Sequence, residues 1–485
     1  MNKPLRHIAI FCGLLVLALL LRDNWLQFVR SDELNSHPKN QRTAIERYSY
    51  PRGDIIVGDK PITGSAESDD SMFKYRRTYV DGPLWAPVTG YASSVFGSDK
   101  LEKIYDPILT GNDDRLFFDR TLSMFTGETK KGGNVVTTLN AAAQKAAFEG
   151  LGDKKGAVAA IDPQTGKILA LASTPSYDPG SIAGRSNADG KAWNAIQDDP
   201  DKPFQNRPLR EIYPPGSTFK VVTAAAAIEA GIVKDINAPT DTPEPYIIPL
   251  SRTPMKNHAQ GCENATLQYA MQWSCNSVFA KLGDEVGRDK MVEMSEKFGF
   301  NSELFTPVRA VASVYDKNMD RGGNAQSAIG QFNTATTPLQ MAMVTAAIAN
   351  DGKLMKPYMV DSIMAPNLDP IEKFEPEEMS RPMSAETAQL VQKMMEVTVE
   401  QGTGQKARIS GVQVGGKTGT AQHGEKNKAR PYAWFISYAK TDSGSPVAVA
   451  VIVEDSDATR DDISGGGLAA PIARDVMKAV LDSRR

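Results

Sequence analysis

The chain has little histidine and cysteine, and its positive and negative charges nearly cancel. Its 485 residues include four histidines and three cysteines, and the formal net charge is -3 at pH 7. The histidines are too few and too scattered for a zinc site or a Ser-His-Asp triad. The near-neutral charge argues against nucleic acid as the main partner. We therefore expect no metal or other cofactor, and we look for chemistry among serine, lysine and asparagine.

Long hydrophobic runs are also scarce, and the exception lies at the N-terminus. The fourteen residues from Ile8 to Leu21 are uninterrupted by charge, and Arg6, Arg22 and Trp25 flank them. As a helix the run alone rises only about 21 Å, which leaves a cleaved signal peptide as an alternative. No small-x-small cleavage site follows Leu21, and flanking Arg and Trp side chains can extend the span. We predict a single-pass anchor within residues 1–30, with a cytoplasmic N-terminus and an extracytoplasmic remainder.

The three cysteines fit that topology only weakly. Cys12 lies inside the apolar run, whereas Cys262 and Cys275 lie in the part expected outside the membrane. An oxidising compartment permits a disulfide between them. Two reduced, partly buried thiols are the alternative. The sequence leaves both open.

Residues 31–152 have the composition of a small, mixed α/β module. Strand character occurs at 48–57, 74–79 and 134–139, with glycine, proline and aspartate between them. Asn140 is placed to cap a helix that runs to Glu149. No set of nucleophile and base occurs in this region. The polar segment 152–156 is the best candidate for a linker to the rest of the chain.

Residues 153–485 have the pattern of a larger α+β domain. Two strands, 157–161 and 168–172, enclose a tight turn, and a helical section follows from Ser217 to about Ile348. Further strands are expected at 412–414, 432–439 and 447–454, with a closing helix at 469–481. We predict a mostly antiparallel sheet with helices on both faces and an all-helical subdomain. Lys417 is expected at the start of an inner strand, where a substrate backbone could add.

Three short polar motifs stand out in this second part. They are Ser217-Thr218-Phe219-Lys220, Ser274-Cys275-Asn276 and Lys417-Thr418-Gly419-Thr420. Roughly one or two Ser-x-x-Lys matches occur by chance in a chain of this length, and this chain has four. Only Ser217 follows a Pro-Pro-Gly turn and opens an apolar run that stops at Gly231, as a buried helix does. The ordered set of three is specific where each motif alone is weak.

These motifs and their surroundings resemble class B penicillin-binding proteins. The resemblance rests on Pro-Pro-Gly-Ser-Thr-Phe-Lys, on Gly330-Gln331 with Thr336-Thr337-Pro338-Leu339-Gln340, and on the segments from Lys417 and from Ala433. It covers nearly the whole chain, and the short N-terminal module is most similar to the actinobacterial penicillin-binding protein A branch. It implies a penicillin-binding, β-lactamase-like transpeptidase domain after a pedestal-like dimerisation domain. Tyr432 departs from the family pattern, which often has histidine there.

The resemblance also implies an activity and a set of roles. Ser217 is expected to be the nucleophile of a D,D-transpeptidase and Lys220 its base, which requires burial and a second ammonium group, Lys417, to lower the pKa of Lys220. Ser274 is expected to relay protons and Asn276 to hold Lys220 and a substrate amide. Lys417, Thr418, Gly419 and Thr420 are expected to bind a D-alanyl-D-alanine carboxylate, and the Ser217 and Thr420 N–H groups to form an oxyanion hole.

The resemblance further implies partners, and two rival functions stay open. Expected partners are peptidoglycan stem peptides, β-lactam antibiotics as covalent inhibitors, a SEDS-family glycan polymerase and divisome proteins. One rival is a β-lactam hydrolase or sensor of the same fold, although no Glu-x-x-Leu-Asn segment lies between Asn276 and Lys417. The other rival is a non-catalytic divisome scaffold.

Overall fold

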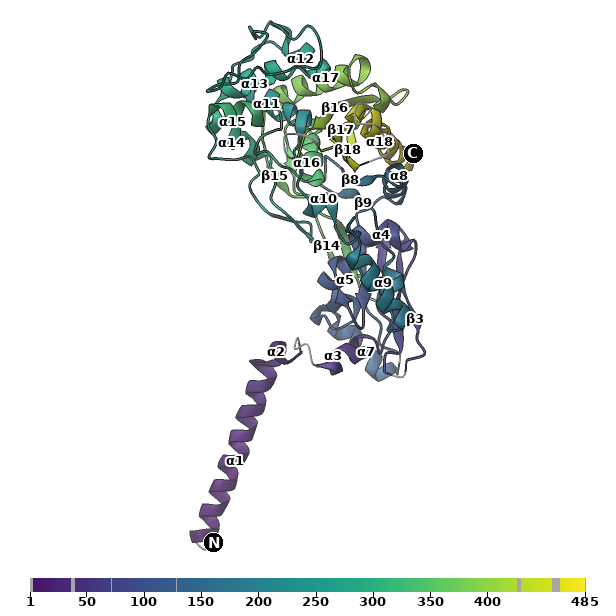
Figure 1. Cartoon of the computed structure of the whole chain (residues 1–485). Helices are drawn as coiled ribbons and strands as arrows, with labels where there is room; N and C mark the ends of the chain where they lie inside the picture. The colour runs from purple at the N-terminus through teal and green to yellow at the C-terminus, as the bar shows by residue number, and fades with distance from the viewer. Residues whose placement is uncertain are drawn as a thin grey trace.

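The structure is a computed structural model, and it describes residues 3–35, 40–70, 72–127, 129–424, 429–455 and 463–484. Figure 1 shows three parts in succession: the helix α1, a narrow module that contains α4, α5 and β3, and a larger domain that contains the C-terminus. The larger domain carries all three polar motifs.

Helix α1 (Lys3–Phe28) stands apart from the rest of the chain, with no buried residue. Its most apolar 18 residues have a mean hydropathy of 2.2, and within the described ranges it is the one helix long and apolar enough to cross a membrane. Its 26 residues rise about 39 Å, more than the roughly 30 Å hydrocarbon core. This helix is therefore a candidate membrane anchor.

The larger domain is built on a five-stranded sheet with the order β16-β17-β18-β8-β9. All four neighbouring pairs are antiparallel. The strands are β8 (Lys155–Ile161), β9 (Ile168–Thr174), β16 (Gln413–Ala421), β17 (Tyr432–Thr441) and β18 (Gly444–Asp455). Both predicted strand pairs, before residue 175 and after residue 430, are present.

One prediction about this sheet is wrong. Lys417 lies in the middle of β16, not at the start of a strand, and β16 is the terminal strand of the sheet, not an inner one. The sequence pattern cannot tell an edge strand from an inner one here, because β16 is buried by helices although one side of its ladder is unpaired. An edge strand has unpaired backbone N–H and C=O groups, which is what addition of a substrate strand requires.

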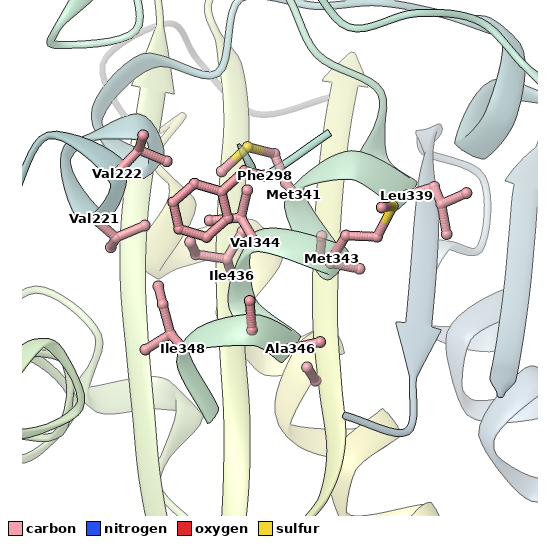
Figure 2. Close-up of a cluster of buried hydrophobic side chains, with 14 of the residues drawn as sticks. Val221, Val222, Phe298, Leu339, Met341, Met343, Val344, Ala346, Ile348 and Ile436 are labelled. Atoms are coloured by element: carbon pink, nitrogen blue, oxygen red, sulfur yellow. The ribbon is translucent and has the colours of Figure 1, made fainter. Parts of the chain in front are cut away.

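Helices α11 (Lys220–Glu229) and α16 (Pro338–Ala349) cover one face of the sheet. Every residue of α16 is buried, and Figure 2 shows its side chains beside Val221, Val222 and Phe298, with Ile436 of β17 in the same cluster. Alternate residues of β17, among them Trp434 and Ile436, point to this face because side chains of a strand alternate. The apolar core under α11 fixes the helix that follows Ser217.

Helices α8 (Ala141–Leu151) and α18 (Ala470–Ser483) cover the opposite face, packed on residues such as Phe435. The Asn140 side chain accepts a hydrogen bond from the Ala143 N–H, which is the predicted cap of α8. Residues 152–156 form a tight connection from α8 into β8, where Gly156 already belongs to the sheet, so they are not a linker.

The all-helical subdomain lies around α11 at the upper left of Figure 1. It contains α12 (Leu267–Trp273), α13 (Asn276–Val286), α14 (Arg288–Lys297) and α15 (Arg321–Ser327), and α17 (Ala385–Gln401) packs beside it on β16. The chain is therefore α+β, and its larger domain has an antiparallel sheet between layers of helices, as predicted.

The N-terminal module has its own five-stranded mixed sheet, in the order β14-β13-β7-β1-β2. Its strands are β1 (Ile55–Val57), β2 (Lys60–Pro61), β7 (Asn134–Thr137), β13 (Val360–Met364) and β14 (Pro370–Lys373). The predicted strand at 48–57 is shorter than expected. Other elements of this part are α3 (Gln41–Arg47), the β3 (Thr63–Glu67) and β4 (Tyr75–Tyr79) hairpin, α4 (Gly82–Thr89), α5 (Lys100–Ile104), α7 (Phe117–Thr126) and α9 (Asn187–Asp198).

Segments from both sides of residue 152 interleave in space. Strands β13 and β14 come from the second half of the chain but complete the sheet of the N-terminal module, and α8 comes from the first half but packs on α18. The division of the chain into domains at residues 1–30, 31–152 and 153–485 stays a proposal. In space, each of the two larger parts contains an element from the other side of residue 152.

A buried ionic cluster stabilises the N-terminal module. Glu102 is fully buried and accepts hydrogen bonds from Arg52 (2.7 Å) and Arg77 (2.6 Å). Arg52 also pairs with Asp106 at 2.6 Å. Breaking such a pair leaves an uncompensated buried charge, which typically costs about 3 to 5 kcal/mol.

Candidate active site

Ser217 lies on a 3-10 turn (Gly216–Phe219) that leads directly into α11. Gly216 has φ +54° and donates its N–H to the Gly330 carbonyl at 2.9 Å. A Cβ on Gly330 would lie 2.1 Å from the Gly216 carbonyl oxygen, so only glycine permits this contact. As predicted, the Pro-Pro-Gly turn directly precedes the start of a helix. The Gly330-Gln331 segment holds this turn in place.

Two further contacts fix the approach to Ser217. Tyr213 and Thr336 exchange backbone hydrogen bonds of 2.9 and 2.8 Å, and Trp434 of β17 donates its indole N–H to the Pro214 carbonyl at 3.0 Å. The half-buried Ser217 hydroxyl has no hydrogen-bond partner within the described part of the chain. It is therefore free to approach a bound carbonyl group.

Lys220 follows Ser217 by one helical turn, and its side chain is completely buried. Its Nζ lies within hydrogen-bond distance of the Ser274 carbonyl oxygen (2.8 Å), the Ser274 hydroxyl (3.1 Å) and the Asn276 Oδ1 (2.7 Å). Burial, and next the charge of Lys417, hold the pKa of Lys220 well below its ordinary value. A lowered pKa is what a lysine needs to act as a base near neutral pH.

Ser274 contacts Lys220 through two oxygen atoms because of its backbone conformation. It ends α12 with φ +64° and ψ 41°, the left-handed region that a serine seldom adopts. In this conformation its carbonyl and its hydroxyl both reach Nζ of Lys220. Such strain costs on the order of 1 to 3 kcal/mol and is concentrated at functional sites.

Asn276 is held by a loop that sequence analysis did not identify. The Asn257 Oδ1 accepts hydrogen bonds from the backbone N–H groups of Asn276 (2.6 Å) and Ser277 (3.0 Å), so Asn257 caps α13 from another segment. The Lys256 carbonyl accepts from Asn276 Nδ2 at 2.8 Å, which leaves Oδ1 of Asn276 facing Lys220. No local pattern around Asn257 predicts this role.

A disulfide connects the same loop to the same motif. Cys262 and Cys275 are bonded, with 5.6 Å between their Cα atoms, and both are buried. Cys275 lies between Ser274 and Asn276. Of the two alternatives that the sequence left open, the structure has the disulfide.

Lys417 is also completely buried, on the edge strand β16. Burial lowers its pKa to about 7, and its Nζ donates to the Thr418 carbonyl at 3.1 Å. Two buried ammonium groups disfavour each other's charged forms, so a charged Lys417 favours the neutral form of Lys220.

Thr418, Gly419 and Thr420 continue the strand beside Ser217. A Cβ on Gly419 would lie 2.9 Å from the Thr218 Cγ2 atom and 3.0 Å from the Pro215 carbonyl oxygen, so glycine is required for the strand to pack this closely on the serine turn. Thr420 is exposed, and its carbonyl is 3.2 Å from the position of a Cβ on Gly216. The backbone at Thr420 is therefore adjacent to that of the serine turn.

Thr403 is a second residue that sequence analysis missed. It follows α17, and its hydroxyl lies 2.7 Å from the Thr418 hydroxyl. Its backbone carbonyl is also 2.5 Å from the position of a Cβ on Gly466, so only glycine fits there. Thr403 thus contacts the strand that is expected to bind the substrate carboxylate.

The structure brings the three motifs into one site without histidine. Among the described residues the Ser217 hydroxyl has no hydrogen-bond partner. The Lys220 amine has a lowered pKa and is hydrogen-bonded to Ser274 and Asn276, and Lys417 is a second buried amine. A hydroxyl, a desolvated amine and backbone N–H groups beside an edge strand are the groups that acyl transfer through a serine ester requires. The fold and the site fit a serine acyltransferase.

Comparisons with known proteins give the family. Residues 156–478 match the penicillin-binding protein transpeptidase domain, and residues 52–135 match the penicillin-binding protein A dimerisation domain. The chain belongs to the penicillin-binding protein family and is a serine-type D,D-transpeptidase. The resemblance inferred from the sequence is confirmed.

Similar proteins come from mycobacteria. The peptidoglycan D,D-transpeptidase PbpA of Mycolicibacterium smegmatis is 39% identical, with 99% of each chain covered. A crystal structure of PBPA from Mycobacterium tuberculosis has a TM-score of 0.84 at 39% identity and covers 90% of this chain and 100% of that one. The ceftriaxone acyl-enzyme complex of that protein has a TM-score of 0.84 at 38% identity, with the same coverage.

Proposed function

We propose that this enzyme cross-links peptidoglycan stem peptides through an acyl-enzyme on Ser217, and that penicillin acylates the same hydroxyl. One observation carries the proposal: the buried Lys220 amine, bonded to Ser274 and Asn276, follows the unpartnered Ser217 hydroxyl by one helical turn. The names of the mycobacterial relatives and their acyl-enzyme structures support it.

Acylation begins when neutral Lys220 takes the proton of the Ser217 hydroxyl. The Ser217 oxygen then forms a bond to the penultimate D-alanine carbonyl carbon, and the carbonyl oxygen gains negative charge. Backbone N–H groups of Ser217 and Thr420 stabilise that charge, and each such donor is typically worth about 3 kcal/mol.

Collapse of this intermediate breaks the peptide bond and releases D-alanine. The leaving nitrogen needs the proton now held by Lys220, and Ser274 is placed to pass it. A neutral amine has two N–H groups and a lone pair, so the Ser274 hydroxyl donates to Lys220 when the amine is neutral and accepts when it is charged. The 3.1 Å contact therefore serves both directions.

Deacylation repeats these steps with a different nucleophile. An amine of a neighbouring stem attacks the ester, Lys220 takes its proton, and the Ser217 oxygen leaves and regains a proton. One amide bond replaces another, so the exchange needs no nucleotide. With water as acceptor the same site would act as a carboxypeptidase.

The remaining motif binds the substrate's free carboxylate. Lys417 supplies a cation, and the hydroxyls of Thr418 and Thr420 supply donors, on a strand whose outer ladder is unpaired. The substrate backbone adds to β16 as a further strand, which orients the scissile carbonyl toward Ser217.

We further propose that the enzyme acts in septal or division-associated wall synthesis at the cell membrane. The helix α1 supports a single-pass anchor, with the N-terminus cytoplasmic because its basic residues flank the apolar run on that side. The proposed partners are a SEDS-family glycan polymerase and divisome proteins, for which the family resemblance is the support. Depletion with measurement of septum formation and of cell length tests this role.

Penicillin labelling tests the reaction. The purified ectodomain should form a covalent adduct, and peptide mapping should place it on Ser217. A correctly folded Ser217→Ala protein should not label, and labelling of that variant would contradict the proposal. Turnover of the adduct within seconds would instead favour a β-lactam hydrolase, and complementation of a deletion by Ser217→Ala would favour a scaffold.

A further inference from the structure

Helix α7 of the N-terminal module has large apolar side chains on its outer surface. Phe117 is 56% exposed, Phe118 83% and Phe125 86%. Since successive residues of a helix are about 100° apart, these three lie on one side of α7. Leu116, which directly precedes the helix, is buried and attaches it to the module. The apolar side of a surface helix normally faces the core, so an apolar side that faces outward marks an interaction surface.

The segment that carries α7 leaves and rejoins the module at the place where the chain from the anchor enters it. The Gly53 N–H donates to the Leu109 carbonyl at 2.8 Å, before α7. The Pro51 carbonyl accepts from the Gly132 N–H at 3.4 Å, after α7. Figure 1 shows α7 and α3 together at the end of the module nearest to α1. The exposed side of α7 is therefore at this end.

The anchor helix brings this end of the module close to the bilayer. The C-terminal turn of α1 and the residue after it carry exposed apolar side chains, Trp25, Phe28 and Val29, and tryptophan is typical of the membrane interface. In the connection that follows, α2 (Ser31–Asn35) contains five residues and α3 seven. Each helical residue adds only about 1.5 Å of length, so the connection is short. A second apolar surface thus lies near the membrane surface that α1 reaches.

We propose that α7 is a second membrane contact, which inserts its phenylalanine side into the outer leaflet of the bilayer that α1 spans. The inference rests on the membrane anchor of the proposed function. Amphipathic helices of this kind lie in the plane of the interface, with the apolar side among the acyl chains. Two points of attachment restrict rotation of the module about the connection after Phe28, and they fix the orientation of the larger domain relative to the bilayer.

The side chains around α7 favour apolar contact over attraction to anionic lipid. Arg115 pairs with Asp113 at 2.8 Å and with Glu372, so its charge is largely neutralised within the protein. Tyr50, 39% exposed, adds an aromatic ring at the same end, with Lys130 Nζ 5.6 Å from the ring centroid. Tyrosine and lysine are typical of the headgroup region. We therefore expect α7 to bind a zwitterionic phosphatidylcholine bilayer.

Fluorescence of the full chain in phosphatidylcholine nanodiscs tests the proposal. Cys262 and Cys275 are bonded to each other, so in a Cys12→Ser background Phe118→Cys supplies a single thiol for an environment-sensitive fluorophore. Lipids with a nitroxide on the acyl chain should quench this label. Adding Phe125→Ser should lower the ratio of docked to undocked label about tenfold, because burial of one phenylalanine side chain has an effect of that size on an equilibrium constant. Phe125→Cys replaces Phe118→Cys if the latter does not fold.

Two further labels serve as controls. Leu250→Cys, in the same background, places the label on a side chain that is 76% exposed, next to Pro249, whose carbonyl packs on Gly322 of α15 in the all-helical subdomain. It should not be quenched. A label on the native Cys12 of the wild-type chain lies within α1 and should be quenched.

The outcomes separate the docking of α7 from the anchor. A label at position 118 that stays in water, while the Cys12 label is quenched, would overturn the docking alone. A label at position 118 that is shielded from water but not quenched by the nitroxide lipids would place a second copy of the chain on this side of α7, and it would also overturn the proposal. A Cys12 label that is not quenched would contradict the proposed anchor and the docking with it.

Discussion

The side-chain oxygen of Asn257 lies 2.6 Å from the backbone nitrogen of Asn276, and Asn276 in turn binds Lys220 at 2.7 Å. A loop outside the three motifs thereby positions a residue that contacts Lys220. Asn257 also donates from Nδ2 to the Ser277 hydroxyl at 2.8 Å, so both ends of its amide are used. Its contribution is to the orientation of the site, not to contact with substrate.

Replacement of Asn257 should weaken acylation without removing it. We expect Asn257→Ala to lower the second-order acylation rate constant about tenfold, since the loss of a helix cap typically costs about 1 kcal/mol and Asn276 also loses its alignment. Asn257→Asp keeps both acceptor bonds but adds a negative charge near Lys220. It should raise the pKa of Lys220 and move the acidic limb of the pH profile upward. Wild-type pH profiles and rates in both variants would contradict this role.

Thr403 should influence binding of the substrate carboxylate through Thr418. When Thr403 donates to the Thr418 oxygen across their 2.7 Å contact, the Thr418 proton is free to donate to a carboxylate. Thr403→Val keeps the shape but removes the hydroxyl, and we expect about a fivefold loss of acylation by penicillin G. Thr403→Ser should restore most of the activity.

The methyl ester of penicillin G separates this role from a structural one. The ester lacks the carboxylate, so Thr403→Val should change its acylation rate little. Equal losses for the acid and the ester would show that Thr403 acts on the fold of the strand and not on carboxylate recognition.

The pH dependence of acylation should be bell-shaped, with an alkaline limb near pH 7. Lys220 must be neutral to accept a proton, so the rate falls as the pH drops below its lowered pKa. Lys417 must be charged to attract a carboxylate, so the rate falls as the pH rises through about 7. Stopped-flow acylation of the free enzyme measures both limbs. With the methyl ester the alkaline limb should flatten, and an unchanged limb would contradict its assignment to Lys417.

The sequence predicts those parts of the site that depend on residues close together in the chain. The turn before Ser217, the helix after it and the order of the three motifs are local patterns, and the structure has them where they were expected. Asn257 and Thr403 reach the site through contacts between distant segments, and an isolated asparagine or threonine in a loop has no distinguishing pattern. The same reason applies to β13, whose pairing with β7 crosses more than 200 residues of chain.

The edge position of β16 illustrates a different limit. Its residues are buried from Val414 to Gly419, as in an inner strand, because α17 and the serine turn cover them. A hydrophobic pattern indicates whether side chains are buried. It does not indicate whether another strand pairs with the backbone on each side. The prediction of an inner strand failed for this reason, and the correction provides the open edge that the substrate needs.

Replacing Lys417 should stabilise the protein while it abolishes activity. The folded pKa of Lys417 is about 7, whereas an unfolded lysine has its ordinary value of 10.5. Between these pH values the unfolded chain binds a proton that the folded chain does not, so wild-type stability rises with pH over this interval. The penalty is greatest below pH 7, where it is roughly 5 kcal/mol, and it vanishes near pH 10.5. Lys417→Met should therefore raise Tm at pH 7, by a margin that shrinks as the pH increases.

Lys393→Met, on the exposed face of α17, is the matched control and should not change Tm measurably. A Tm for Lys417→Met at or below that of the wild type at pH 7 would show that the fold does not disfavour this ammonium group, and the inference that Lys417 favours the neutral form of Lys220 would lose its basis.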